Sequence, residues 1–200
     1  MAYLRLSEAR ALGRTESARL QKSAATILIE EARAIPAEAR FDVFLSHSFR
    51  DAQIILALKR LAQSGGLSVY VDWLDDPGLD RDHVTAATAA TLQRRMRASS
   101  SLVYAHSPNA SDSTWMPWEL GFFDGLKPGF VWVLPLVDQD DSEFTGQEYL
   151  GLYPALENLE DVSSRISLGF TRVTEGNLMR TIPLLEAARG VGLVKTAKGW

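Results

Sequence analysis

The chain of 200 residues contains no cysteine. Without thiols it can hold no disulfide framework, thiolate zinc site, iron–sulfur cluster or cysteine nucleophile. Its three histidines, His47, His83 and His106, are not spaced like metal ligands, so we expect no metal site. The lack of cysteine also fits a reducing compartment, and we predict a cytoplasmic protein.

Long apolar runs are missing as well. No stretch approaches the ~18 apolar residues that a membrane-spanning helix requires. The first twelve residues carry charge throughout instead of the apolar core of a signal peptide. The net charge of −4 gives no basic field that would attract nucleic acid. We therefore expect neither a membrane nor a nucleic acid as a partner.

Several common site signatures are absent too. The sequence has neither G-x-G-x-x-G nor G-x-x-x-x-G-K-[ST], which excludes the Rossmann phosphate turn and the P-loop. It also lacks the G-x-S-x-G nucleophile elbow of many serine hydrolases.

What the sequence does show, from residue 41 on, is an alternation of short apolar segments with helix-like segments. Strands are expected at 41–45, 67–71, 101–105 and 130–137, and helices at 51–63, 83–97 and 115–126. Such alternation predicts βαβ units and a parallel sheet. Farther on, the pattern indicates a fifth strand at 165–173 and a last helix at 177–188. The expected fold is α/β, a flavodoxin-like open parallel sheet of about five strands flanked by helices.

The first 40 residues have a different pattern. Leu20, Ala24, Ile27 and Leu28 form one face of a helix expected over 16–34, with room for a shorter helix near 6–12. We therefore divide the chain into an N-terminal helical extension, residues 1–40, and a domain, residues 41–200. Because an isolated helix of this length is marginally stable in water, the extension should pack on the domain or on a neighbouring protomer.

Ligands of open α/β sheets bind at the carboxyl ends of the strands. In this sequence the polar segments Ser46-His47-Ser48, Asp72-Trp73 and His106-Ser107 follow the first three expected strands. The binding site should lie among them.

A second candidate feature is the start of the helix at 115–126. Trp115 and Glu119 are four residues apart and share one helix face. Pro117 is tolerated in the first turn. Glu119 then lies about one turn inside the positive end of the helix, which favours the ionised carboxylate. Taken alone, such a pair is more often a solvated glutamate beside a core tryptophan.

Taken together, three features of residues 41–140 resemble the Toll/interleukin-1 receptor (TIR) domain. They are a strand Asp-Val-Phe-Leu-Ser-His-Ser, a strand Val-Tyr-Val-Asp, and Trp-x-x-x-Glu opening the helix before an apolar strand. The runs at 115–125 and 146–154 look most like stand-alone bacterial TIR proteins, which include the TIR component of the Thoeris antiphage defence system.

The resemblance implies an enzyme that cleaves the nicotinamide–ribose bond of NAD, with NAD as substrate and no cofactor. Glu119 matches the catalytic glutamate of the family, and a carboxylate can stabilise an oxocarbenium-like ribose. Ser46 and His47 match the loop that lines the nucleotide pocket. Asp72 and Trp73 begin the loop that covers it, and Trp115 matches the tryptophan that shapes it.

Three functions fit this resemblance. The first is cyclisation of ADP-ribose into a signalling nucleotide that activates an antiphage defence effector. The second is plain NAD glycohydrolase activity acting by NAD depletion, and the third is a non-catalytic adaptor acting by TIR–TIR interaction. Glu119 favours the two enzymes, and the sequence does not separate them. We also expect self-association through TIR surfaces, with the acidic loop 72–82 in a gating or assembly role.

Overall fold

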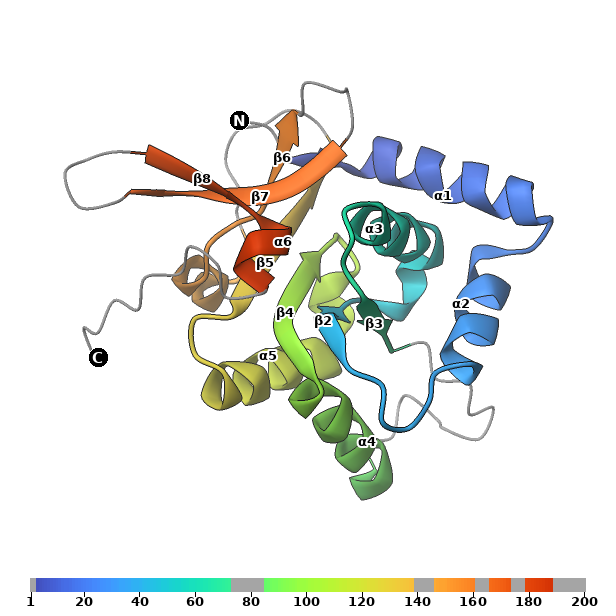
Figure 1. The fold of residues 1–200 in the computed structure, drawn as a ribbon, viewed down its shortest axis with the longest axis horizontal. Helices are drawn as coiled ribbons and strands as arrows, with labels where there is room; N and C mark the ends of the chain where they lie inside the picture. The colour runs from blue at the N-terminus through green and yellow to red at the C-terminus, as the bar shows by residue number, and fades with distance from the viewer. Residues whose placement is uncertain (1–2, 73–84, 139–145, 161–165, 174–178, 189–200) are drawn as a thin grey trace.

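The computed structural model describes residues 3–72, 85–138, 146–160, 166–173 and 179–188 (Figure 1). Its first sheet holds β1 (Leu4–Arg5), β2 (Phe41–Ser46), β3 (Val69–Val71), β4 (Ser99–His106) and β5 (Val131–Val137). Its second sheet holds β6 (Glu157–Glu160), β7 (Ile166–Val173) and β8 (Met179–Pro183). The helices are α1 (Leu6–Leu20), α2 (Ala24–Arg33), α3 (Ala52–Ser64), α4 (Ala86–Arg97), α5 (Trp115–Leu126) and α6 (Leu184–Ala188). Three short 3₁₀ turns, η1 (Phe49–Asp51), η2 (Ala110–Asp112) and η3 (Glu148–Leu152), complete the described elements.

The five strands of the first sheet lie in the order β1-β5-β4-β2-β3, and every pair is parallel. The expected α/β fold with an open parallel sheet is therefore confirmed. β2 and β4 are neighbours in the sheet. From β2 the chain first adds β3 on one side, and it then crosses back to form β4 on the other side. The strand order reverses at this pair, which is where flavodoxin-like sheets bind their ligands.

The fifth strand of this sheet comes from the N-terminus. Leu4 and Arg5 of β1 pair with Leu136 and Val137 of β5. The segment predicted as the fifth strand, 165–173, does contain a strand, β7, but β7 pairs antiparallel with β6 and β8 in the second sheet. Leu4 is fully buried, so β1 is anchored at this edge of the sheet although it is only two residues long.

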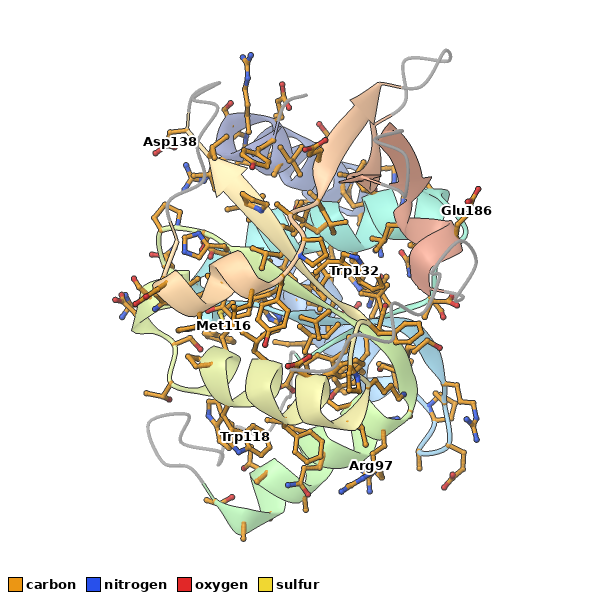
Figure 2. All side chains as sticks on the ribbon, turned by 90° about the vertical axis from the view of Figure 1, so that its left-hand side faces the viewer. Arg97, Met116, Trp118, Trp132, Asp138 and Glu186 are labelled. Atoms are coloured by element: carbon orange, nitrogen blue, oxygen red, sulfur yellow. The ribbon has the colours of Figure 1, made fainter. Side chains whose placement is uncertain are left out.

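Helices cover both faces of the parallel sheet (Figure 1). One core joins the β-strands to α1, α2, α3 and α6, and includes the fully buried Trp132. The other core joins the strands to α4, α5 and η3. Figure 2 shows α5 with Met116 on its sheet side and Trp118 on its outer side. Arg97 of α4 lies over the ring of Phe122, 5.3 Å from its centroid. Period-two alternation along each strand decides which side chain enters which core.

The predicted helix over 16–34 is wrong in its extent, because two helices meet inside that range. α1 ends at Leu20, where Gln21 adopts a left-handed conformation with φ of 53°. Ser23 then caps α2 by accepting a hydrogen bond from the amide of Thr26. The pattern of apolar residues ran through the break because both helices pack toward α3.

The contact between α1 and α3 is close. A β-carbon placed on Gly13 would lie 2.0 Å from the carbonyl oxygen of Gln53. Ion pairs flank the contact: Arg60 of α3 binds Glu16 of α1 at 2.7 Å and also binds Glu31 of α2. In the described structure the N-terminal helices therefore pack on the sheet domain, and the division at residue 40 stays a prediction.

Two other predicted boundaries differ from the structure. The range expected to form one helix at 177–188 contains strand β8 followed by the short helix α6. The helix expected from residue 83 is described from Ala86, with Thr85 as its capping residue. In the part of the chain that the structure describes, no helix has the length and apolarity needed to cross a membrane.

Candidate active site

Polar side chains gather where β2, β3 and β4 end, on the face that α5 covers. On β2, Phe44 belongs to the core beneath α4 and α5, and Ser46 lies two residues farther along the same face. The same alternation places Asp72 after Tyr70 of β3, and His106 after Tyr104 of β4. The carboxyl ends of the central strands thus direct Ser46, Asp72 and His106 toward one side of the sheet.

A close polar contact at this edge joins Ser46 to Glu119. The Ser46 hydroxyl donates a hydrogen bond of 2.5 Å to Oε2 of Glu119. Both side chains are buried, with only 4% of Glu119 and 1% of Ser46 exposed. The structure thus brings together two predicted site residues that are 73 positions apart in the sequence.

The start of α5 explains why a charged side chain lies at this buried position. The helix begins at Trp115, so Pro117 falls in its first turn and Glu119 is its fifth residue. Met116, Leu120 and Phe123 are buried against the sheet and fix the rotation of the helix. Glu119 therefore faces the ends of the strands from near the positive end of the helix dipole, which favours its ionised form.

Two tyrosines that sequence reasoning missed adjoin this carboxylate. Burial raises the pKa of Tyr70, with smaller contributions from Asp72 and Glu119 and an opposing one from Arg95. Burial also raises the pKa of Tyr104, followed by contributions from Tyr149 and Glu119. Both phenols thus stay neutral at physiological pH. Their positions two residues before Asp72 and His106 were the signal that could have found them.

A second buried network joins the loops after β2 and β4. Asp51 accepts hydrogen bonds from the Ser107 hydroxyl at 2.5 Å and from Nδ2 of Asn109 at 2.7 Å. Asp51 and Ser107 are 5% and 2% exposed. This network holds the loops on either side of the β2–β4 switch point in a fixed relation. Sequence reasoning did not single out Asp51 or Asn109.

The remaining predicted site residues take several places. Nδ1 of half-buried His47 lies 2.8 Å from the carbonyl oxygen of Leu45. Trp115 lies one turn before Glu119 and packs edge-on against Trp118, with ring centroids 5.4 Å apart. Trp73, together with nearly all of the acidic loop 72–82, lies outside the described residues.

His106 packs against the ring of Tyr104, with centroids 6.4 Å apart. Burial lowers the pKa of this histidine, which favours the neutral imidazole. No group of three or more potential metal ligands occurs among the residues that the structure describes. The chemically distinctive element of the site is therefore the Ser46–Glu119 pair.

Comparison with known proteins gives two informative relatives, while no family model matches the chain. The chain is 52% identical over 115 residues to a protein of Bacillus cereus (strain MSX-D12) named probable 3' cyclic ADP-D-ribose synthase ThsB'. It is 31% identical over 83 residues to a protein of Cytobacillus dafuensis named putative cyclic ADP-D-ribose synthase TIR2. The resemblance to bacterial TIR proteins is confirmed.

The matches cover 57% and 41% of this chain, and 59% and 22% of the respective relatives. The chain thus matches less than two thirds of the length of either TIR relative. The sheet topology agrees with the resemblance to TIR proteins. Glu119 lies on α5, the helix that precedes β5, and its side chain faces the point where the strand order reverses.

Proposed function

We propose that the protein cleaves the nicotinamide–ribose bond of NAD and closes the ADP-ribose into a cyclic signalling nucleotide. The observation that carries this proposal is the buried carboxylate of Glu119, held by Ser46 at the switch point of the sheet. The two relatives named as cyclic ADP-D-ribose synthases support the same chemistry.

Glu119 would stabilise positive charge on the ribose as the bond between C1′ and the nicotinamide nitrogen breaks. The electron pair of that bond stays with nicotinamide, which leaves as a neutral molecule and needs no general acid. A hydroxyl oxygen of the same ADP-ribose then attacks C1′, and its proton passes to the carboxylate and on to solvent. The hydrogen bond from Ser46 fixes the orientation of the carboxylate throughout.

Plain hydrolysis differs only in the nucleophile, since water then attacks C1′ and linear ADP-ribose results. A purely adaptor role would leave the burial of Glu119 without a use, because burying a charge is costly and adds nothing to an exposed docking surface. The relatives' names favour the cyclic product. Its action on an antiphage defence effector, as in the Thoeris system, is part of the proposal. NAD as substrate and self-association of TIR surfaces belong to this proposal.

The test is incubation with NAD followed by chromatography of the products. We expect the wild type to release nicotinamide, and Glu119→Gln to lose about 10²–10³-fold in rate because the substitution removes one preorganised electrostatic group. Asp124→Asn is the matched control, because it removes a charge from the same helix at a site where Asp124 accepts from Tyr153 at 3.2 Å.

Asp124→Asn should keep the rate within about twofold, since amide and carboxylate oxygens both accept that bond. Wild-type protein that releases no nicotinamide would refute the enzyme, as would Glu119→Gln protein with more than a tenth of the wild-type rate. A product mixture containing only linear ADP-ribose would refute cyclisation but not cleavage.

A further inference from the structure

The hydroxyl of Tyr104 has no hydrogen-bond partner among the described residues, although its residue is fully buried. Other buried hydroxyls along the sheet are paired: Ser46 donates to Glu119, Ser101 to the carbonyl of Asp42, and Ser107 to Asp51. A buried polar group without a partner is costly and rare, so such a group calls for an explanation. Phenylalanine would fill the same space without this cost.

Tyr104 lies beside the catalytic candidates. In the register between β2 and β4 it is the direct partner of Ser46, whose hydroxyl binds Glu119. The charge of Glu119 acts on the Tyr104 phenol. Tyr149 of η3 adjoins the phenol and contributes to its raised pKa, and the Tyr149 hydroxyl donates its own proton to Oε1 of Gln147 at 2.7 Å. The Tyr104 hydroxyl thus lies between Tyr149 on one side and the Ser46–Glu119 pair of the candidate active site on the other.

The chemistry of the hydroxyl limits what it can bind. Because its pKa is raised, Tyr104 remains a neutral phenol and offers one O–H donor. A ribose presents hydroxyl and ring oxygens that can accept such a bond. Tyr104 is the register partner of Ser46, which holds Glu119, so a ribose placed against this carboxylate would lie next to the phenol.

We propose that Tyr104 is a substrate-binding residue whose hydroxyl donates a hydrogen bond to an oxygen of the nicotinamide-bearing ribose and so positions C1′ against Glu119. This inference rests on the proposed cleavage of NAD and adds a residue to its site. It explains why the Tyr104 hydroxyl is buried without a described partner in the free protein, since the bound ribose would supply an acceptor.

The experiment compares Tyr104→Phe with wild-type protein in thermal unfolding without substrate and in steady-state nicotinamide release from NAD. We expect the melting temperature to stay the same or rise, because the substitution removes an unpaired buried hydroxyl. We expect kcat/KM to fall about tenfold or more, because the ribose loses its partner.

Ser17→Ala is the matched control. The Ser17 hydroxyl is also buried without a described partner, but it lies on α1, which packs on the opposite side of the sheet from α5. Its removal should likewise not lower the melting temperature and should leave kcat/KM unchanged.

The outcomes separate this inference from the proposed function. Nicotinamide release by wild-type protein together with an unchanged kcat/KM in Tyr104→Phe overturns the inference and leaves the proposed function intact. A fall in kcat/KM accompanied by a lower melting temperature also overturns it, since the hydroxyl would then stabilise the free protein. Absence of any nicotinamide release by wild-type protein refutes the proposed function and, with it, the inference.

Discussion

At the scale of single residues, the hydroxyl of Ser46 donates a hydrogen bond of 2.5 Å to the carboxylate of Glu119. Both residues are almost completely buried. Hydrogen bonds to charged groups are worth about 1.5–3 kcal/mol, more than bonds between neutral groups. We therefore expect Ser46 to position the carboxylate in addition to any contact with substrate.

This view predicts the behaviour of Ser46→Ala. Nicotinamide release should fall by about 10- to 100-fold, mainly in kcat, because the carboxylate loses its fixed orientation. Steady-state kinetics with NAD measure the effect. Ser48→Ala in the same loop is the control, because the bond that the Ser48 hydroxyl accepts from the amide of Arg50 is long, at 3.5 Å. Equal losses in the two variants would contradict a specific role for Ser46.

At the scale of elements, the site depends on how α5 and the two loops are held. Asp51 ties the loop after β2 to the loop after β4, which leads into α5. On the other side of the sheet, α1 packs on α3 so closely that residue 13 has no room for a side chain. The Asp51 hydrogen bonds thus hold the two loops, and the close approach at Gly13 holds α1. The local sequence of these elements would permit other orientations.

Gly13→Ala tests the α1–α3 contact. Its β-carbon would meet the backbone of Gln53 at 2.0 Å, so the helices must move apart. We expect a loss of about 1–3 kcal/mol in the free energy of unfolding, which denaturant titration measures.

Gly125→Ala serves as the control, because a β-carbon there meets nothing within 4 Å. That variant should be neutral or more stable by up to about 1 kcal/mol, since alanine favours the helix. A Gly13→Ala protein as stable as the wild type would show that α1 is not held against α3 in solution.

At the scale of the whole molecule, the N-terminal helices are part of the folded unit. Glu16 of α1 binds Arg19 and Arg60, and these hydrogen bonds lower its pKa to about 2. The folded state therefore binds fewer protons than the unfolded state as the pH falls from about 4.5 toward 2. The stabilisation by Glu16 is fully present above this range and is lost within it.

Urea unfolding at a series of pH values between 6 and about 2 checks this prediction. The free energy of unfolding should fall less steeply with acidification in Glu16→Gln than in the wild type, because the variant lacks the titrating carboxylate. Glu8→Gln is the control, since Glu8 lies 4.0 Å from Arg5 at the surface. Identical pH profiles for the wild type and Glu16→Gln would contradict the assignment.

Much of the sheet could be predicted from local patterns. The apolar segments around Val43, Tyr70, Val103 and Val133 form strands in the predicted order, because a strand buried on both faces needs a continuous apolar run. The edge strand at Leu4 could not be predicted, since two residues carry no periodicity. The break at Gln21 was missed because the apolar face continues on both sides of it.

The sequence by itself determined the chemical types at the site and their places at strand ends, because side-chain alternation and βαβ connectivity are local properties. It thereby determined that Ser46 and Glu119 would lie at the same edge of the sheet. Only the tertiary structure decided that these two side chains share a hydrogen bond and that Tyr104 lies buried beside them with its hydroxyl unpaired among the described residues. Such contacts depend on how helices and strands pack across the sheet, which no local pattern encodes.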